Sequence, residues 1–260
     1  MISVHHKNYI KEKLKLGKAV IGTWAIIPSS IVTDIIASTN IDFIIIDAEH
    51  GPITFETAQE MVIACESRNV SPIMRVGGVI ESEILRALDI GAHGIQIPNV
   101  QSKSDVERII QFSKYPPIGN RGFSPFTRAG NYSIESSTSL TKNANKNNLI
   151  GINVEGKEAI DNIDEILKIE ALDIIFIGLF DLSKSLGIPG KVKDKKVINL
   201  LKNLTNKINK AGKYPGTIAT SEKDLIKYKK MGLKYILYLV DCEMLRNSYS
   251  SIVTKFKSIN

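Results

Sequence analysis

The chain has 260 residues, of which 43% are hydrophobic and 23% charged, a composition typical of a globular protein that buries a substantial core without disulfides. Its net charge of +7 comes from lysines scattered along the chain, so it does not indicate a nucleic-acid-binding protein. Cys65 and Cys242 lie far apart and outside any CxxC motif, which argues against a disulfide framework or a structural zinc site.

The first residues lack the apolar segment of a signal peptide, and no apolar run approaches the roughly 18 residues that span a bilayer. We therefore expect a cytoplasmic protein with no membrane partner. The basic balance of the chain would help it to attract a small anionic substrate.

Short β-branched segments alternate with segments of helical periodicity from one end of the chain to the other. The predicted strands span residues 19–27, 42–47, 71–76, 94–100, 149–155, 173–179, 214–220 and 235–241. The predicted helices include residues 54–69, 102–115, 156–169, 194–212 and 242–259. Most of the strands are continuous apolar runs, which is typical of strands buried on both faces.

This alternation predicts an α/β protein, a single (β/α)8 (TIM) barrel that spans residues 1–260 without a linker. An open doubly wound sheet is the alternative fold. It is disfavoured because no GxGxxG turn follows the first strand, and we accordingly expect no nucleotide cofactor.

The longest interruption of the pattern is residues 115–132, which contain several aromatic residues and arginines. A loop of this length inside a domain is usually functional or disordered, and its composition argues against disorder. Arg128 in this loop either meets an anionic substrate tail or braces the loop.

In a (β/α)8 barrel the active site is built at the C-terminal ends of the strands. Polar residues follow four of the predicted strands: Asp47, Glu49 and His50 after the second, Arg75 after the third, Asn153 and Glu155 after the fifth, and Asp181 after the sixth. Each also has a structural alternative, for example a helix N-cap for Asp181 or a first-turn acid for Glu155. Their convergence on one mouth of the barrel favours a functional site.

Glu155 and Asp181 come from adjacent strands and are predicted to hold one divalent cation. Two acids leave coordination positions for waters or substrate oxygens, which suits Mg²⁺, Mn²⁺ or Co²⁺ better than a closed zinc site. Such a cation and Arg75 could hold a 2-oxo acid and stabilise an enolate oxygen. His50 could move protons, with Asp47 fixing its tautomer. No lysine follows these strands, so a Schiff-base mechanism is disfavoured.

Several motifs together resemble the HpcH/HpaI aldolases, metal-dependent class II enzymes that act on pyruvate and its aldols. The similarity covers most of the chain and includes "FIIIDAEHGP", "PIMRV", "ALDIGAHGIQIPNVQS", "YPPIGNRGFSPFTRAG", "VEGKEAIDNIDEIL" and "FIGLFDLSKSLGIPG". The combination is specific, although no single motif would be.

The resemblance implies a role for each matching residue. His50 corresponds to the proton-transfer base, and Arg75 to the arginine that binds the pyruvate carboxylate and oxo group. Glu155 and Asp181 correspond to the metal carboxylates, and Asp181 also adjoins the substrate. Asp47 matches an acid near the arginine and histidine. Asp89, in "ALDIGAHG", matches an acid that raises the basicity of the histidine. No separate role follows for Glu49.

Asp89 does not fit the expected topology of a single barrel, because it precedes the fourth strand and should lie at the opposite end from the site. Either it is a helix-end residue or it acts from an unexpected position, such as a neighbouring subunit. The resemblance implies a homo-oligomer, a hexamer in which the C-terminal helix, residues 242–259, is exchanged between subunits. The apolar stripe Met244, Leu245, Ile252 and Phe256 is compatible with this exchange and also with packing on its own barrel.

Two departures from the family pattern affect the predicted substrate site. Asn153 stands where the family usually has a substrate-contacting glutamine, one methylene longer. Leu179 and Phe180 replace small residues before the second metal acid, so we expect Phe180 to alter the fit of the substrate.

Three hypotheses for function follow. The first is a divalent-metal-dependent aldolase that cleaves or forms 4-hydroxy-2-oxo acids, with pyruvate and an aldehyde as partners. The second uses the same enolate to decarboxylate an oxaloacetate-type substrate. The third is a non-catalytic barrel that binds a 2-oxo acid. The bulk of Phe180 is the reason for considering it. The retained His50, Arg75, Glu155 and Asp181 disfavour the third.

Overall fold

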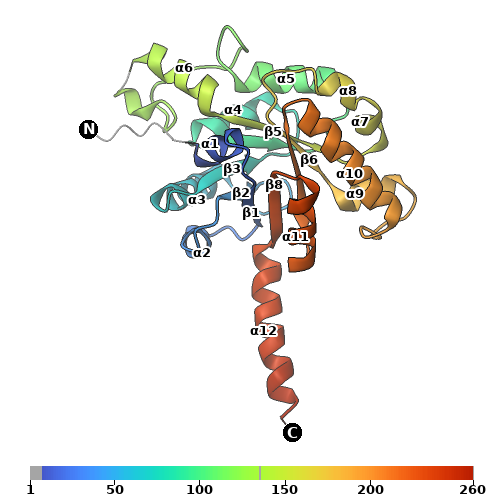
Figure 1. Ribbon diagram of the computed structural model, residues 1–260. Helices are drawn as coiled ribbons and strands as arrows, with labels where there is room; N and C mark the ends of the chain where they lie inside the picture. The colour runs from blue at the N-terminus through green and yellow to red at the C-terminus, as the bar shows by residue number, and fades with distance from the viewer. Residues whose placement is uncertain (1–7, 135, 260) are drawn as a thin grey trace.

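Eight parallel strands form a closed barrel in the order of the chain (Figure 1). The structure is a computed structural model that describes residues 8–134 and 136–259. The strands are β1 (Val20–Ala25), β2 (Phe43–Asp47), β3 (Ser71–Arg75), β4 (Gly94–Ile97), β5 (Leu149–Val154), β6 (Ile174–Ile177), β7 (Tyr214–Ala219) and β8 (Tyr235–Val240). Strand β8 pairs with β1 and closes the barrel. The predicted (β/α)8 fold is therefore confirmed.

Helices surround the barrel and follow its strands (Figure 1). They are α1 (Tyr9–Lys15), α2 (Ser30–Ala37), α3 (Phe55–Ser67), α4 (Glu81–Asp89), α5 (Lys103–Ser113), α6 (Ser137–Asn147), α7 (Lys157–Asp161), α8 (Ile163–Ile166), α9 (Leu179–Ser185), α10 (Lys195–Lys210), α11 (Glu222–Met231) and α12 (Asp241–Lys257), with a short 3₁₀ turn at Asn131–Ser133. Several begin at side-chain caps, as the sequence predicts. Ser102, for example, forms a capping box with Asp105 at the start of α5.

The predicted single helix over residues 156–169 is wrong in detail, because the structure divides it into α7 and α8 at Asn162. The Asn162 side chain donates a hydrogen bond to the carbonyl of Gln101 across 3.0 Å. This bond ties the break between α7 and α8 to the loop that precedes α5.

Successive residues of each strand face the barrel interior and the helix layer in turn. In β2, Phe43 and Ile45 pack in the interior cluster, whereas Ile44 and Ile46 pack beneath the helices. All four are fully buried, which explains why this strand is a continuous apolar run. Gly22 in β1 leaves space for the ring of Phe43, because a Cβ at that position would overlap the ring.

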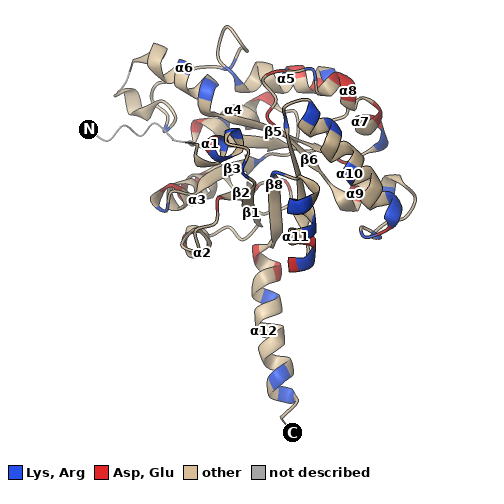
Figure 2. Ribbon diagram, in the orientation of Figure 1, with Lys and Arg blue, Asp and Glu red and all other residues tan. Residues whose placement is uncertain are grey.

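Helix α12 extends away from the barrel rather than along it (Figure 1). Its large apolar side chains are exposed: Met244, Leu245, Tyr249, Ile252, Val253 and Phe256. Lysines and arginines occur on α12 and on several other outer helices in the view of Figure 2. Among the residues described, no helix has both the length and the apolar character needed to cross a membrane.

Candidate active site

Asp47 and Arg75 meet at the C-terminal ends of β2 and β3, where they are register partners. The Nε of Arg75 donates to Oδ1 of Asp47 across 2.8 Å, and its Nη2 donates to Oδ2. Both residues are buried. A two-point pair between a guanidinium and a carboxylate fixes the plane of the arginine as well as its charge. The pairing of β2 with β3 thus fixes the orientation of the Arg75 guanidinium.

Two further contacts hold the Arg75 guanidinium. The Trp24 ring lies beneath it, with 4.0 Å between the guanidinium carbon and the ring centroid. Oε2 of Glu49 lies 2.9 Å from Nη1, although outside hydrogen-bond geometry. Burial raises the pKa of Glu49, and the positive charge of Arg75 opposes that shift. Sequence reasoning gave Glu49 no role, and the only signal that could have found it was its place in the DxEH motif.

The loop after β2 differs from the sequence prediction in which acid lies beside the His50 imidazole. Oδ1 of Asp47 accepts the backbone N–H groups of Glu49 (3.1 Å) and His50 (3.3 Å), so Asp47 shapes the loop rather than pairing with the imidazole. The His50 side chain is 70% exposed, and its Nε2 lies 4.0 Å from Oε2 of Glu49. These contacts put Glu49 in the position beside the imidazole where Asp47 was expected.

Glu155 is held at the end of β5 by hydrogen bonds to both carboxylate oxygens. Its Oε1 accepts from Nδ2 of Asn153 across 2.8 Å, and its Oε2 accepts from the backbone N–H of Asn99 across 3.3 Å. The predicted role of Asn153 was substrate contact. In the structure Asn153 is fully buried, and its amide is bonded to Glu155 on one side and Gln96 on the other.

Asp181 lies in the first turn of α9 and is exposed. The N-cap of this helix is Gly178, so the alternative interpretation of Asp181 as an N-cap is wrong. Gly178 also makes room for Glu155, because a Cβ at this position would lie 2.9 Å from Cγ of Glu155. The turn between β6 and α9 thereby allows Glu155 to lie against the helix that carries Asp181.

The predicted site residues converge on one cavity of about 300 Å³ at the mouth of the barrel. Its lining includes Asp47, His50, Arg75, Asn153, Glu155, Phe180 and Asp181. Apolar side chains complete the wall: Trp24, Ile26, Phe176, Leu179, Ile218 and Val240. A second cavity of about 420 Å³, lined by Gln101, Lys157 and Lys184 among others, shares Glu155 and Asp181 with the first. The two acids therefore stand on the boundary between two open spaces.

The donor set of Glu155 and Asp181 suits a hard divalent cation, because it consists of carboxylate oxygens. Among the residues that the structure describes, no group of three or more histidines, cysteines or acids is arranged to hold a metal ion. A cation at these two acids would therefore take its remaining ligands from substrate or water. This is the arrangement expected of an open site rather than a closed structural one.

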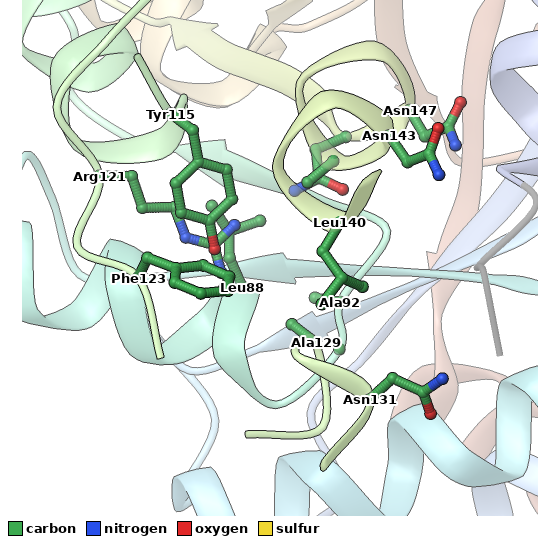
Figure 3. Close-up of a pocket in the computed structure, with 13 residues that line it drawn as sticks. Leu88, Ala92, Tyr115, Arg121, Phe123, Ala129, Asn131, Leu140, Asn143 and Asn147 are labelled. Carbon is green, nitrogen blue, oxygen red and sulfur yellow. The ribbon is translucent and has the colours of Figure 1, made fainter. Parts of the chain in front are cut away.

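Asp89 is the one predicted site residue that the structure keeps apart. It ends α4, close to the N-terminal end of β4, and its Oδ1 accepts a hydrogen bond from Nη2 of Arg121 across 2.6 Å. The pocket beside this pair, shown in Figure 3, measures only about 40 Å³ and is lined by Leu88, Tyr115 and Arg121 among others. That volume suits one or a few waters and is too small for a substrate.

The same region settles the place of Arg128 in the long loop. Its Nη2 pairs with Oε2 of Glu66 on α3, and the backbone N–H of Ala129 donates to the carbonyl of Asp89. Of the two predicted alternatives, bracing of the loop is the one observed.

Comparison with known proteins assigns the family. The sequence model described as HpcH/HpaI aldolase/citrate lyase matches residues 21–247. The chain belongs to this family. The predicted family, and with it the prediction of an aldolase-type lyase, is confirmed.

Two curated relatives and one solved structure illustrate the similarity of this HpcH/HpaI family member to known proteins. The 2-keto-3-deoxy-L-rhamnonate aldolase of Escherichia coli O17:K52:H18 is 30% identical over 96% of this chain and 94% of its own length. The 5-keto-4-deoxy-D-glucarate aldolase of Shigella boydii serotype 18 is 28% identical over 96% of each chain. The structure of citrate synthase SbnG aligns with a TM-score of 0.88 and 30% identity, covering 97% of this chain and 98% of that one.

Proposed function

We propose that this HpcH/HpaI family member is a cytoplasmic, divalent-metal-dependent aldolase that cleaves or forms 4-hydroxy-2-oxo acids through the enolate of pyruvate. The observation that carries the proposal is the single cavity into which His50, Arg75, Glu155 and Asp181 converge. The names of the curated relatives, which are aldolases of deoxy keto acids, support the same class of substrate.

Arg75 supplies the fixed positive charge of the proposed mechanism. Its guanidinium is oriented by Asp47, Glu49 and Trp24 before any substrate arrives. A preorganised donor of this kind stabilises negative charge that develops on a carbonyl oxygen, because it needs no reorientation during the reaction. Arg75 is therefore proposed to bind the 2-oxo acid and to stabilise the enolate.

His50 is proposed to move the proton. In the cleavage direction it takes the proton from the 4-hydroxyl group as the C3–C4 bond breaks, which releases the aldehyde and the pyruvate enolate. A proton then returns to C3 of the enolate and yields pyruvate. The exposed imidazole beside the cavity has the access that this exchange requires.

A divalent cation, Mg²⁺, Mn²⁺ or Co²⁺, is proposed to bind between Glu155 and Asp181. When bound, it would supply Lewis-acid polarisation of the 2-oxo group. The chain itself contributes two carboxylates, of which Glu155 is oriented by Asn153 and Asn99.

The glycine at residue 178 provides a test of this metal position. We expect Gly178→Ala to push Glu155 aside and to weaken Mn²⁺ binding by about 10- to 100-fold, the range typical when the support of a metal ligand is lost. Mn²⁺ titration followed by electron paramagnetic resonance measures the affinity. Gly156→Ala is the matched control, because nothing lies within 4 Å of a Cβ at that position. Equal Mn²⁺ affinities in the two variants would contradict the proposed metal position at Glu155.

Phe180 is proposed to restrict the substrate. Phe180 is 53% exposed, whereas the neighbouring Leu179, which also lines the cavity, is buried. We expect Phe180→Ala to lower the Kd for pyruvate several-fold and to accept bulkier aldehydes, because the side chain occupies space at the mouth. Isothermal titration with pyruvate and Mn²⁺ measures the first effect. An unchanged Kd would show that Phe180 does not limit the donor site.

We also propose that the protein is a homo-oligomer, a hexamer, in which α12 is exchanged between subunits. Two features support exchange: the exposed apolar side chains of α12 and an apolar cavity of about 360 Å³ between α2 and the base of α12. Its lining includes Ile35, Ile36 and Leu245. We expect truncation after Ser248 to give smaller species in light scattering after size exclusion. An unchanged mass would contradict the exchange.

A citrate-forming condensation is a second candidate, favoured by the 30% identity to the citrate synthase structure. It can be separated from aldol chemistry by product. In the presence of Mn²⁺, the aldolase proposal predicts pyruvate release from 4-hydroxy-2-oxo acids, measured with a coupled lactate dehydrogenase assay, and its loss with chelator. Citrate formation from oxaloacetate and acetyl-coenzyme A, without pyruvate release from any aldol, would favour the second candidate instead.

A further inference from the structure

We infer that a buried chain of hydrogen bonds, Tyr235 to Gln96 to Asn153, positions the Glu155 carboxylate, and that Asn153 is a positioning residue rather than a ligand of substrate. The inference rests on the proposed function, in which Glu155 holds the cation. It departs from the role that the resemblance to the family implied for residue 153.

The chain of hydrogen bonds crosses the barrel interior. Oη of Tyr235, at the start of β8, donates to Oε1 of Gln96 across 3.3 Å. Nε2 of Gln96 in β4 donates to Oδ1 of Asn153 across 2.7 Å, and Nδ2 of Asn153 in β5 donates to Oε1 of Glu155 across 2.8 Å. Tyr235, Gln96 and Asn153 are each no more than 1% exposed. Three strands thus support one carboxylate oxygen.

The direction of every bond in this chain follows from the charge at its end. An ionised Glu155 can only accept, so Asn153 must turn its NH₂ group toward it. The carbonyl oxygen of Asn153 then faces Gln96, which must present its own NH₂ group. The oxygen of Gln96 consequently faces Tyr235, whose hydroxyl must donate. No member can rotate without leaving a buried polar group unpaired, which is costly.

Tyr235, the member of the hydrogen-bond chain farthest from Glu155, is rigidly packed. The Tyr235 ring stacks on Phe43 with 4.1 Å between centroids, in the packed interior of the barrel. Burial raises the pKa of the Tyr235 hydroxyl well above its usual range, which keeps the group protonated and able to donate. The second oxygen of Glu155 is held separately by the N–H of Asn99. The carboxylate is therefore fixed at two points and retains lone pairs for a cation.

This arrangement also accounts for the shorter side chain at residue 153. Both the oxygen and the nitrogen of the Asn153 amide are engaged within the protein. Asn153 lies in the wall of the cavity, but it exposes no surface there, and its amide is already bonded to two protein partners. Its effect on the reaction would pass through Glu155.

Mn²⁺ binding, measured by electron paramagnetic resonance, tests the inference in full-length protein. We expect Asn153→Leu, which keeps the branching and heavy-atom count of the side chain but removes the donor, to raise the Kd for Mn²⁺ by about 10- to 100-fold. Tyr235→Phe should raise the Kd for Mn²⁺ about three- to ten-fold, because it removes only the hydrogen bond farthest from Glu155. Thr205→Val is the control: it deletes a buried hydrogen bond to the Leu201 carbonyl in α10, away from the site, and should leave the Kd unchanged.

The outcomes separate the inference from the proposed function. Wild-type Mn²⁺ affinity in Asn153→Leu, with weaker pyruvate binding, would overturn the inference and restore a substrate role for Asn153. If Asn153→Leu does not fold, Tyr235→Phe provides the test. A Kd for Mn²⁺ equal to that of Thr205→Val would overturn the inference that the hydrogen-bond chain positions Glu155. Absence of Mn²⁺ binding by the wild-type protein would overturn the proposed metal site, and the inference with it.

Discussion

Replacing Arg75 by alanine is expected to lower the rate of aldol cleavage by at least about 100- to 1,000-fold, as removal of a preorganised oxyanion donor typically does. The expected loss is large because the structure holds this guanidinium in one orientation through Asp47, Glu49 and Trp24. The variant also leaves Asp47 buried without its partner, so its thermal stability is measured alongside the rate.

Two further variants test whether the effect depends on the geometry and location of Arg75. Arg75→Lys keeps the charge but cannot reproduce the two-point pair with Asp47, so it should recover little of the activity. Arg68→Ala removes an arginine that also pairs with an aspartate, Asp34, but on the exposed surface, and should behave as wild type. Cleavage at the wild-type rate by folded Arg75→Ala would show that the assigned role is wrong.

Replacing His50 by alanine is expected to slow aldol cleavage by about 100- to 10,000-fold, the usual contribution of a positioned acid–base group. The imidazole is exposed on the cavity and makes few contacts, so the variant should keep the stability of the wild type. A cleavage rate close to wild type would remove His50 from the mechanism.

The role of Asp89 can be tested by combining an Asp89 variant with the His50 variant. Within one chain it lies toward the N-terminal end of the barrel, paired with Arg121, so the family-like role requires a neighbouring subunit. We expect co-expressed His50→Ala and Asp89→Asn chains to form hybrid oligomers more active than either variant alone, because some sites would combine an intact His50 with an intact Asp89. Isolated hybrids with no gain in activity would show that Asp89 serves its own chain, as a helix-end residue.

The sequence was sufficient to predict the barrel because the strands are buried on both faces and leave an unmistakable pattern. The run from Phe43 to Ile46 is apolar throughout, since the residues alternate between two cores rather than between core and solvent. The convergence of His50, Arg75, Glu155 and Asp181 on one cavity also followed from the rule that polar strand ends share a mouth.

The contacts among those residues could not be read from the sequence. The two-point pair of Arg75 depends on the register of β2 against β3, which sets Asp47 opposite Arg75. The loop after β2 then places Glu49 between Arg75 and His50. The link from Asn153 to Gln96 joins residues 57 positions apart, a separation that no local pattern records. The bond from Asn162, at the break between α7 and α8, to the carbonyl of Gln101 is non-local in the same way.

The most direct test of the central claim is exchange of the pyruvate methyl protons with deuterated solvent, followed by proton nuclear magnetic resonance. Enolate formation beside Arg75 and His50 requires this exchange whatever aldehyde the enzyme uses. We predict that the wild-type protein accelerates exchange with Mn²⁺ present and that excess chelator abolishes the acceleration. Exchange at the uncatalysed rate, with protein and Mn²⁺ both present, would contradict the proposed enolate chemistry.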